Sequence, residues 1–136
     1  MSNSSTAHSA GARRILIVDD NIDSAQSLAM LLGMSGYDTH TAHDGVEAVR
    51  CAEQLLPDAM LLDIGLPRQN GYEVCRCIRE QPWGKRMVLI ALTGWGQDND
   101  RRQAEQAGFD SHIVKPVDFE GLLRMLESLL ARPAAP

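Results

Sequence analysis

Residues 14–20 read RILIVDD, a short run of apolar, strand-forming side chains that ends in two aspartates. Unbroken apolar runs of this length are typical of strands buried on both faces of a sheet. Residues 59–63 (AMLLD) and 87–93 (MVLIALT) repeat the arrangement, and residues 111–115 (SHIVK) form a shorter version of it. The sequence therefore predicts four buried strands, each followed by a polar side chain.

Helical patterns alternate with these runs along the whole chain. A weaker, alternating strand covers residues 37–42, and the helical segments cover about residues 23–32, 44–54, 72–80, 97–107 and 118–131. Strict alternation of short strands with helices predicts an α/β fold, in which one five-stranded parallel sheet carries helices on both faces. In such sheets ligands bind beyond the carboxyl ends of the strands.

Length and composition limit the classes of protein that fit. The chain has 136 residues, of which 44% are hydrophobic and 23% charged, with a formal net charge of −5. This length suits one domain with its own core, and no run approaches the roughly 20 apolar residues of a membrane helix. The acidic balance argues against direct binding to nucleic acid or to an anionic membrane.

The two ends of the chain differ in composition from the rest. Residues 1–12 are small and polar and lack the apolar stretch of a secretory signal, and residues 133–136 read PAAP. We expect a disordered segment over residues 1–12, one domain over residues 13–132 and a short tail over residues 133–136. The three cysteines are odd in number and fit a reduced, cytoplasmic setting.

The polar residues that follow the predicted strands form the candidate site. If the sheet is parallel, Asp19, Asp20, Asp63, Thr93 and Lys115 all project from one edge. Two like charges about 4 Å apart repel by roughly 4 kcal/mol at an effective dielectric constant of about 20, so a cation is expected among these carboxylates. Hard oxygen ligands favour Mg²⁺, one carboxylate can act as a nucleophile toward phosphorus, and the lysine and threonine can contact the phosphoryl oxygens.

Each of these residues also has a plainer interpretation. Asp19 or Asp20 could cap the helix that follows, and Asp63 could be a turn residue. Thr93 alone would be a structural hydroxyl, and Lys115 a solvated surface charge. The chain has only two lysines against eleven arginines, however, so a lysine directly after a strand is informative. Their common position at strand ends favours a site.

Four motifs resemble the receiver domain of two-component response regulators, and the resemblance covers nearly everything from residue 14 to residue 130. It implies a flavodoxin-like doubly wound arrangement with strand order 2-1-3-4-5. The segment LTGWGQ, residues 92–97, resembles receivers attached to hybrid histidine kinases. The matching motifs are ILIVDDN (15–21), LLDIGLP (61–67) with NGYEV (70–74), ALTG (91–94) and IVKP (113–116).

The resemblance also implies a role for each residue of the candidate site. Asp63 is the implied phosphoacceptor, and Mg²⁺ is bound by Asp19, Asp20, Asp63 and the backbone carbonyl of Gly65. Thr93 is the implied switch hydroxyl. Lys115 pairs with the phosphoryl group, and its bond to the following proline is expected to be cis.

The implied activity is that of a signalling switch. Such a domain takes its phosphoryl group from a histidine kinase or a histidine phosphotransfer protein, and it catalyses its own phosphorylation and dephosphorylation. His112 stands where the family usually has a rotating tyrosine or phenylalanine, and an imidazole there can swing and sense charge. We expect Trp95 to lie near the mouth of the site.

Other functions are compatible with parts of the pattern. A haloacid-dehalogenase-like phosphatase also uses an aspartate nucleophile with Mg²⁺, but that family implies a second aspartate where this chain has Gly65. A flavodoxin-like or dinucleotide-binding module needs a phosphate loop after the first strand, where this chain has acids. A receiver without phosphorylation chemistry would not need Asp63 and Lys115. The chain is either a single-domain regulator or a receiver excised from a larger kinase or regulator.

Overall fold

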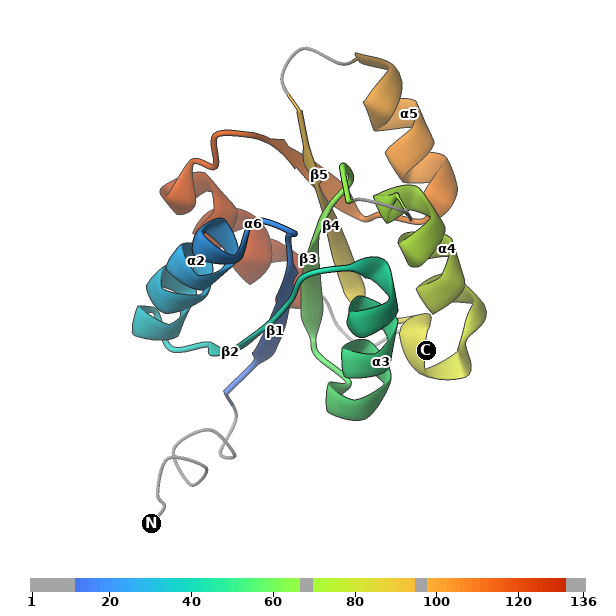
Figure 1. Cartoon of the computed structure of the whole chain (residues 1–136). Helices are drawn as coiled ribbons and strands as arrows, with labels where there is room; N and C mark the ends of the chain where they lie inside the picture. Colours follow the sequence, from blue (N-terminus) through green and yellow to red (C-terminus); the bar gives the residue numbers. More distant parts are fainter. Residues whose placement is uncertain (1–11, 67–69, 95–97, 132–136) are drawn as a thin grey trace.

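Five parallel strands form the central sheet of the computed structural model, which describes residues 12–66, 70–94 and 98–131 (Figure 1). The strand order is β2-β1-β3-β4-β5, so the predicted flavodoxin-like order 2-1-3-4-5 is confirmed. All four neighbouring pairs are parallel. The strands are β1 (Arg14–Val18), β2 (Asp38–Ala42), β3 (Ala59–Asp63), β4 (Val88–Thr93) and β5 (Ser111–Val114).

Helices cover both faces of the sheet, with α2 and α6 on one side and α3, α4 and α5 on the other (Figure 1). A short 3₁₀ turn, η1, lies between α4 and β4. The bounds are α2 (Ile22–Met34), α3 (Gly45–Leu55), α4 (Gly71–Glu80), η1 (Pro82–Gly84), α5 (Asp98–Ala107) and α6 (Phe119–Leu130).

The two faces explain why the strands are apolar throughout. In β1, Leu16 and Val18 are fully buried in the core beneath α3, α4 and α5, whereas Ile15 and Ile17 are fully buried in the core beneath α2 and α6. Successive side chains of a strand point to opposite faces, so a strand covered on both sides needs apolar residues at every position.

The predicted tail segments lie outside the described residues, apart from Ala12. No helix within the described part of the chain is long and apolar enough to cross a membrane.

The start of α2 decides between two interpretations of the acidic pair. Asn21 is the N-cap, and its side chain accepts a 3.0 Å hydrogen bond from the backbone N–H of Ser24. Asp19 instead accepts a 3.0 Å bond from the backbone N–H of Asn21. Because Asn21 caps the helix, neither aspartate is used for that purpose.

We therefore predict that Asn21→Ala lowers the free energy of unfolding by about 1 kcal/mol, because it removes the acceptor at the helix start. Asn21→Asp, which keeps an acceptor, should retain most of the stability, and Asp20→Ala should lose none of the capping energy. Chemical denaturation of the three variants measures this. Equal losses in Asn21→Ala and Asp20→Ala would show that Asp20 supports the helix after all.

Candidate functional site

Three aspartates meet at the carboxyl edge of the sheet. Asp19 and Asp20 follow β1, and Asp63 ends β3, the strand paired with β1. The register pairs Val18 with Leu62, so the next residue of each strand falls at the same level. One carboxylate oxygen of each aspartate lies within 4.8 Å of the others. The sequence-predicted acids are thus brought together, and oxygen ligands in this arrangement could hold a hard divalent cation such as Mg²⁺.

The three carboxylates differ in their exposure to water. Asp19 is buried, with 4% of its surface accessible, whereas Asp63 is partly buried and Asp20 is exposed. The buried position makes the charge on Asp19 costly unless a cation compensates it.

Lys115 reaches this cluster from the end of β5, the outermost strand on the β4 side of the sheet. It follows β5, and its backbone N–H donates a 2.9 Å hydrogen bond to the carbonyl of Thr93. Its Nζ lies 2.8 Å from Asp63 Oδ2 and 3.4 Å from Asp19 Oδ2. The Lys115–Pro116 peptide bond is cis, as predicted. One ammonium group therefore bridges two carboxylates that are distant in the sequence.

Burial and neighbouring charges shift the pKa values of Asp19 and Lys115. Burial raises the pKa of Asp19 above its usual value, and the charge of Asp63 adds to the rise. The Asn21 N–H and the Lys115 ammonium offset only part of this effect. Burial alone would lower the pKa of Lys115, but its hydrogen bond to Asp63 and the charges of Asp63 and Asp19 raise it above the ordinary value. Lys115 consequently stays charged, and its ammonium offsets only part of the cost of burying the Asp19 carboxylate.

Thr93 and Gly65 are the two remaining residues of the predicted site. The Thr93 hydroxyl is buried and donates a 3.3 Å hydrogen bond to the carbonyl of Ile113 on β5. Gly65 donates its backbone N–H to Asp63 Oδ1 at 2.9 Å. Both oxygens of Asp63 thus accept hydrogen bonds, one from Gly65 and one from Lys115. The expected role of the Gly65 carbonyl as a metal ligand stays a prediction.

Gly71 is a residue of this site that the sequence analysis missed. A Cβ atom at this position would lie 2.8 Å from the Asp63 carbonyl oxygen and 2.7 Å from Ile64 Cα, so only glycine lets α4 begin against the end of β3. Asn70 caps the helix and forms a capping box with Glu73. The spacing of Asn70 and Glu73 could have indicated that a helix begins at residue 71, because a capping residue followed three positions later by glutamate is typical of a helix start.

Two further residues were expected to bear on the site, and the structure describes only one of them, His112. His112 lies in β5, paired in register with Ala91, and lines a hollow of about 280 Å³ beside Glu105 of α5. It is partly buried and faces α5. Trp95 lies outside the described residues.

Comparison with known proteins identifies the family. The model of the response regulator receiver domain matches residues 15–127, and the chain belongs to this family. Among curated proteins, the DNA-binding dual master transcriptional regulator RpaA of Synechocystis is 36% identical over 119 residues. The response regulator MprA of Mycobacterium ulcerans is 39% identical over the same length. These alignments cover 88% of this chain but only 49% and 50% of the two regulators, so the chain spans about half of their length.

Solved receiver structures share the fold. The chemotaxis response regulator CheY4 of Vibrio cholerae superposes with a TM-score of 0.81 at 29% identity, covering 87% of this chain and 98% of that one. The receiver domain of the sensor histidine kinase PA1611 of Pseudomonas aeruginosa, whose active-site cleft coordinates a magnesium ion, gives 0.82 at 35% identity, covering 90% and 100%. Regulators and a kinase-attached receiver are both similar, so the resemblance to hybrid-kinase receivers stays a prediction at the level of the subfamily.

The raised pKa of Asp19 leads to a prediction for the protein without divalent cations. A carboxyl whose pKa is raised by folding stabilises the folded state below its unfolded pKa and loses that contribution as the pH rises through the folded value. Asp19→Asn should therefore unfold at a higher denaturant concentration than the wild type at pH 7, and this advantage should shrink as the pH is lowered through the raised pKa.

Urea unfolding at several pH values in EDTA measures the difference. Asp118→Asn, a change at an exposed aspartate that makes no side-chain capping bond, serves as the matched control. A lower midpoint for Asp19→Asn at pH 7 would show that its contacts with Lys115 and Asn21 outweigh the cost of burial.

Proposed function

We propose that this receiver domain is a phosphorylation switch whose phosphoacceptor is Asp63. The observation that carries the proposal is the bridge from Lys115 Nζ to Asp63 and Asp19 within a cluster of three carboxylates. A lysine so placed is positioned to contact an oxygen of a phosphoryl group on Asp63. The magnesium-bound receiver of the Pseudomonas kinase supports the same use of the acidic edge.

The proposed reaction is a transfer between two side chains. A carboxylate oxygen of Asp63 attacks phosphorus in a phosphohistidine of the partner, the O–P bond forms as the P–N bond breaks, and the imidazole leaves with its electron pair. Water later attacks the phosphorus, the O–P bond to Asp63 breaks, inorganic phosphate leaves and the carboxylate of Asp63 is restored. In both reactions the chain supplies its own site residues, so it catalyses its phosphorylation and dephosphorylation.

We infer that Mg²⁺ is the cofactor of this site. Asp19, Asp20, Asp63 and the Gly65 carbonyl would hold it, and the bound ion supplies positive charge that offsets the repulsion between the carboxylates and an incoming phosphoryl group. The convergence of three carboxylates, one of them buried, supports this. Lys115 keeps its proton and remains a second source of positive charge.

The switch is proposed to act through Thr93. Its hydroxyl currently donates to the Ile113 carbonyl, and a phosphoryl oxygen on Asp63 would compete for the same proton. Loss of that bond changes the end of β5 next to His112, and hence the surface formed by α5 and β5. This surface is where a downstream protein partner would read the phosphorylated state.

The phosphoryl donor needs a surface that leads to Asp63. A groove of about 440 Å³ begins at Asp19 and Lys115 and runs beside α2, where Leu28 and Leu31 line it. Further along this helix Met34 is 79% exposed. We propose that a histidine kinase or a histidine phosphotransfer protein docks here, without direct contact of this domain with nucleic acid or membrane. The acidic net charge and the three free thiols are consistent with action in the cytoplasm.

We predict that incubation with acetyl phosphate and Mg²⁺ adds the mass of one phosphoryl group to the wild type and none to Asp63→Asn. The amide of the variant keeps the size of the side chain but cannot form the acyl phosphate. Intact-mass spectrometry measures the addition, and Asp118→Asn should be labelled like the wild type. Stable label on Asp63→Asn would place the phosphoacceptor elsewhere.

A second prediction distinguishes the role of Thr93 in the conformational change from the phosphorylation chemistry at Asp63. Beryllofluoride with Mg²⁺ should shift the NMR amide signals of Ile113 and Val114 in the wild type, because the Thr93 hydroxyl leaves the Ile113 carbonyl. Thr93→Val should still bind beryllofluoride, as the signal of Gly65 would report, but should lose most of the shift in β5. Wild-type shifts in that variant would mean that Thr93 does not transmit the change.

A further inference from the structure

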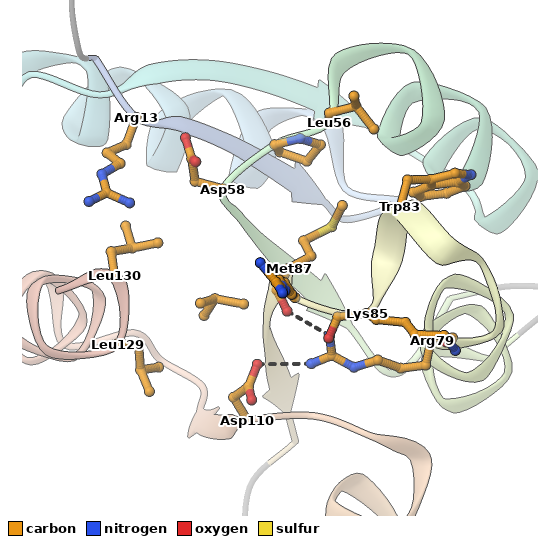
Figure 2. Close-up of a pocket in the computed structure, with 13 residues that line it drawn as sticks. Arg13, Leu56, Asp58, Arg79, Trp83, Lys85, Met87, Asp110, Leu129 and Leu130 are labelled. Atoms are coloured by element: carbon orange, nitrogen blue, oxygen red, sulfur yellow. Dashed lines mark hydrogen bonds and ion pairs between the residues drawn. The ribbon is translucent and has the colours of Figure 1, made fainter. Parts of the chain in front are cut away.

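A pocket of about 520 Å³ lies at the opposite edge of the sheet from the acidic site (Figure 2). Its lining includes Arg13 before β1, Asp58 before β3, Met87 before β4 and Asp110 before β5. These positions all lie at the amino ends of parallel strands, whereas Asp63 lies at a carboxyl end. The pocket is therefore spatially separate from the phosphorylation site.

Arg79 and Asp110 form an ion pair inside this pocket, and Asp58 is held by a backbone N–H. Arg79 Nη2 donates to Asp110 Oδ2 at 2.9 Å, and its Nη1 donates to the Met87 carbonyl at 2.7 Å, as Figure 2 shows. Asp58 Oδ2 accepts a 2.8 Å bond from the backbone N–H of Arg14. Arg79 and Asp110 therefore compensate each other, whereas the carboxylate of Asp58 is held by a neutral backbone donor.

The rim of the pocket, by contrast, carries positive charge that the fold does not use. The guanidinium groups of Arg13 and Arg86 are exposed, and neither forms a hydrogen bond or ion pair with another residue of the described chain. Lys85 Nζ donates one hydrogen bond, at 2.9 Å, to the Arg79 carbonyl. Three cations thus surround an opening in a chain whose net charge is −5. Such a rim is complementary to carboxylates.

The upper wall of the pocket offers apolar surface beside these cations. Leu56 ends α3 in the left-handed conformation, with φ 48° and ψ 59°, and is 55% exposed. Glycine or asparagine usually occupies this position, because a side chain is strained there. Trp83 of η1 is partly exposed on the same side. A strained, exposed leucine that lines the same pocket as a tryptophan and two arginines has the composition of a protein-binding surface.

We propose that this pocket docks an acidic, amphipathic segment of a partner protein. Carboxylates of the segment would pair with Arg13, Lys85 and Arg86, and its apolar side chains would pack against Leu56 and Trp83. A free inorganic anion could use the cations but would leave both apolar side chains uncovered, so the combination favours a peptide. The proposal concerns a second surface and does not depend on phosphorylation of Asp63.

A titration of the full chain, labelled with ¹⁵N and free of tags, tests the proposal. The probe is a synthetic peptide of alternating glutamate and leucine residues. We expect saturable shifts of the Trp83 indole signal and of the Leu56 and Arg86 amides. A peptide with lysine in place of glutamate, and inorganic phosphate alone, should leave the Leu56 and Trp83 signals in place. No shift at these residues, or equal shifts with the lysine peptide, would overturn the proposal.

Two variants locate the contacts. Arg13→Glu combined with Arg86→Glu should raise the dissociation constant of the peptide at least about tenfold, whereas Arg102→Glu combined with Arg124→Glu, the same charge change at exposed arginines elsewhere, should not. Leu56→Gly should bind more weakly while its thermal midpoint rises, because glycine relieves the left-handed strain. Equal weakening by both arginine pairs would reduce the effect to net charge and overturn the proposed site, and wild-type affinity in Leu56→Gly would remove Leu56 from it.

Discussion

Repulsion between carboxylates at one edge of the sheet is the constraint on which the site depends. Asp19, Asp20 and Asp63 lie within reach of a single ion, and Asp19 is buried. In the structure the Lys115 ammonium bridges two of the three and lowers the cost of holding them together. The third, Asp20, remains exposed. The residual negative charge makes the edge receptive to a cation and, once the cation is bound, to a phosphoryl group.

The sheet makes this convergence possible and also connects it to the rest of the molecule. β1, β3, β4 and β5 are consecutive neighbours in the sheet, so the residues that follow them share one edge. The bond from Thr93 to the Ile113 carbonyl ties the end of β4 to β5, and Lys115 is the second residue beyond Ile113. In the proposed mechanism a change at Asp63 would reach β5 through Lys115, which contacts Asp63 directly, and through the Thr93 hydroxyl. The amino edge of the same strands carries a different surface, with arginines at its rim, so the two edges offer partners opposite charge.

Much of the fold could be predicted from the sequence, because each buried strand is apolar at every position and the helices alternate with them. The candidate site residues, apart from Gly65, could be predicted from their position directly after the strands. The strand order and the role of each residue came from the resemblance to receiver domains, and the family match and the sheet confirm the family and the strand order. Details that depend on close packing could not be predicted in this way. The contact of Gly71 with the Asp63 backbone and the left-handed Leu56 each depend on how two segments meet. The choice of Asn21 as helix cap, in place of either aspartate, likewise depended on the local path of the chain.

The central claim is that acids from β1 and β3 share one divalent cation, and paramagnetic NMR tests it most directly. Substoichiometric Mn²⁺, which takes the same oxygen ligands as Mg²⁺, broadens the signals of nuclei close to the ion. The account predicts that broadening centres on Asp19, Asp20, Asp63 and Gly65 and that excess Mg²⁺ reverses it. Broadening centred on another cluster of carboxylates, or none at this edge of the sheet, would contradict it.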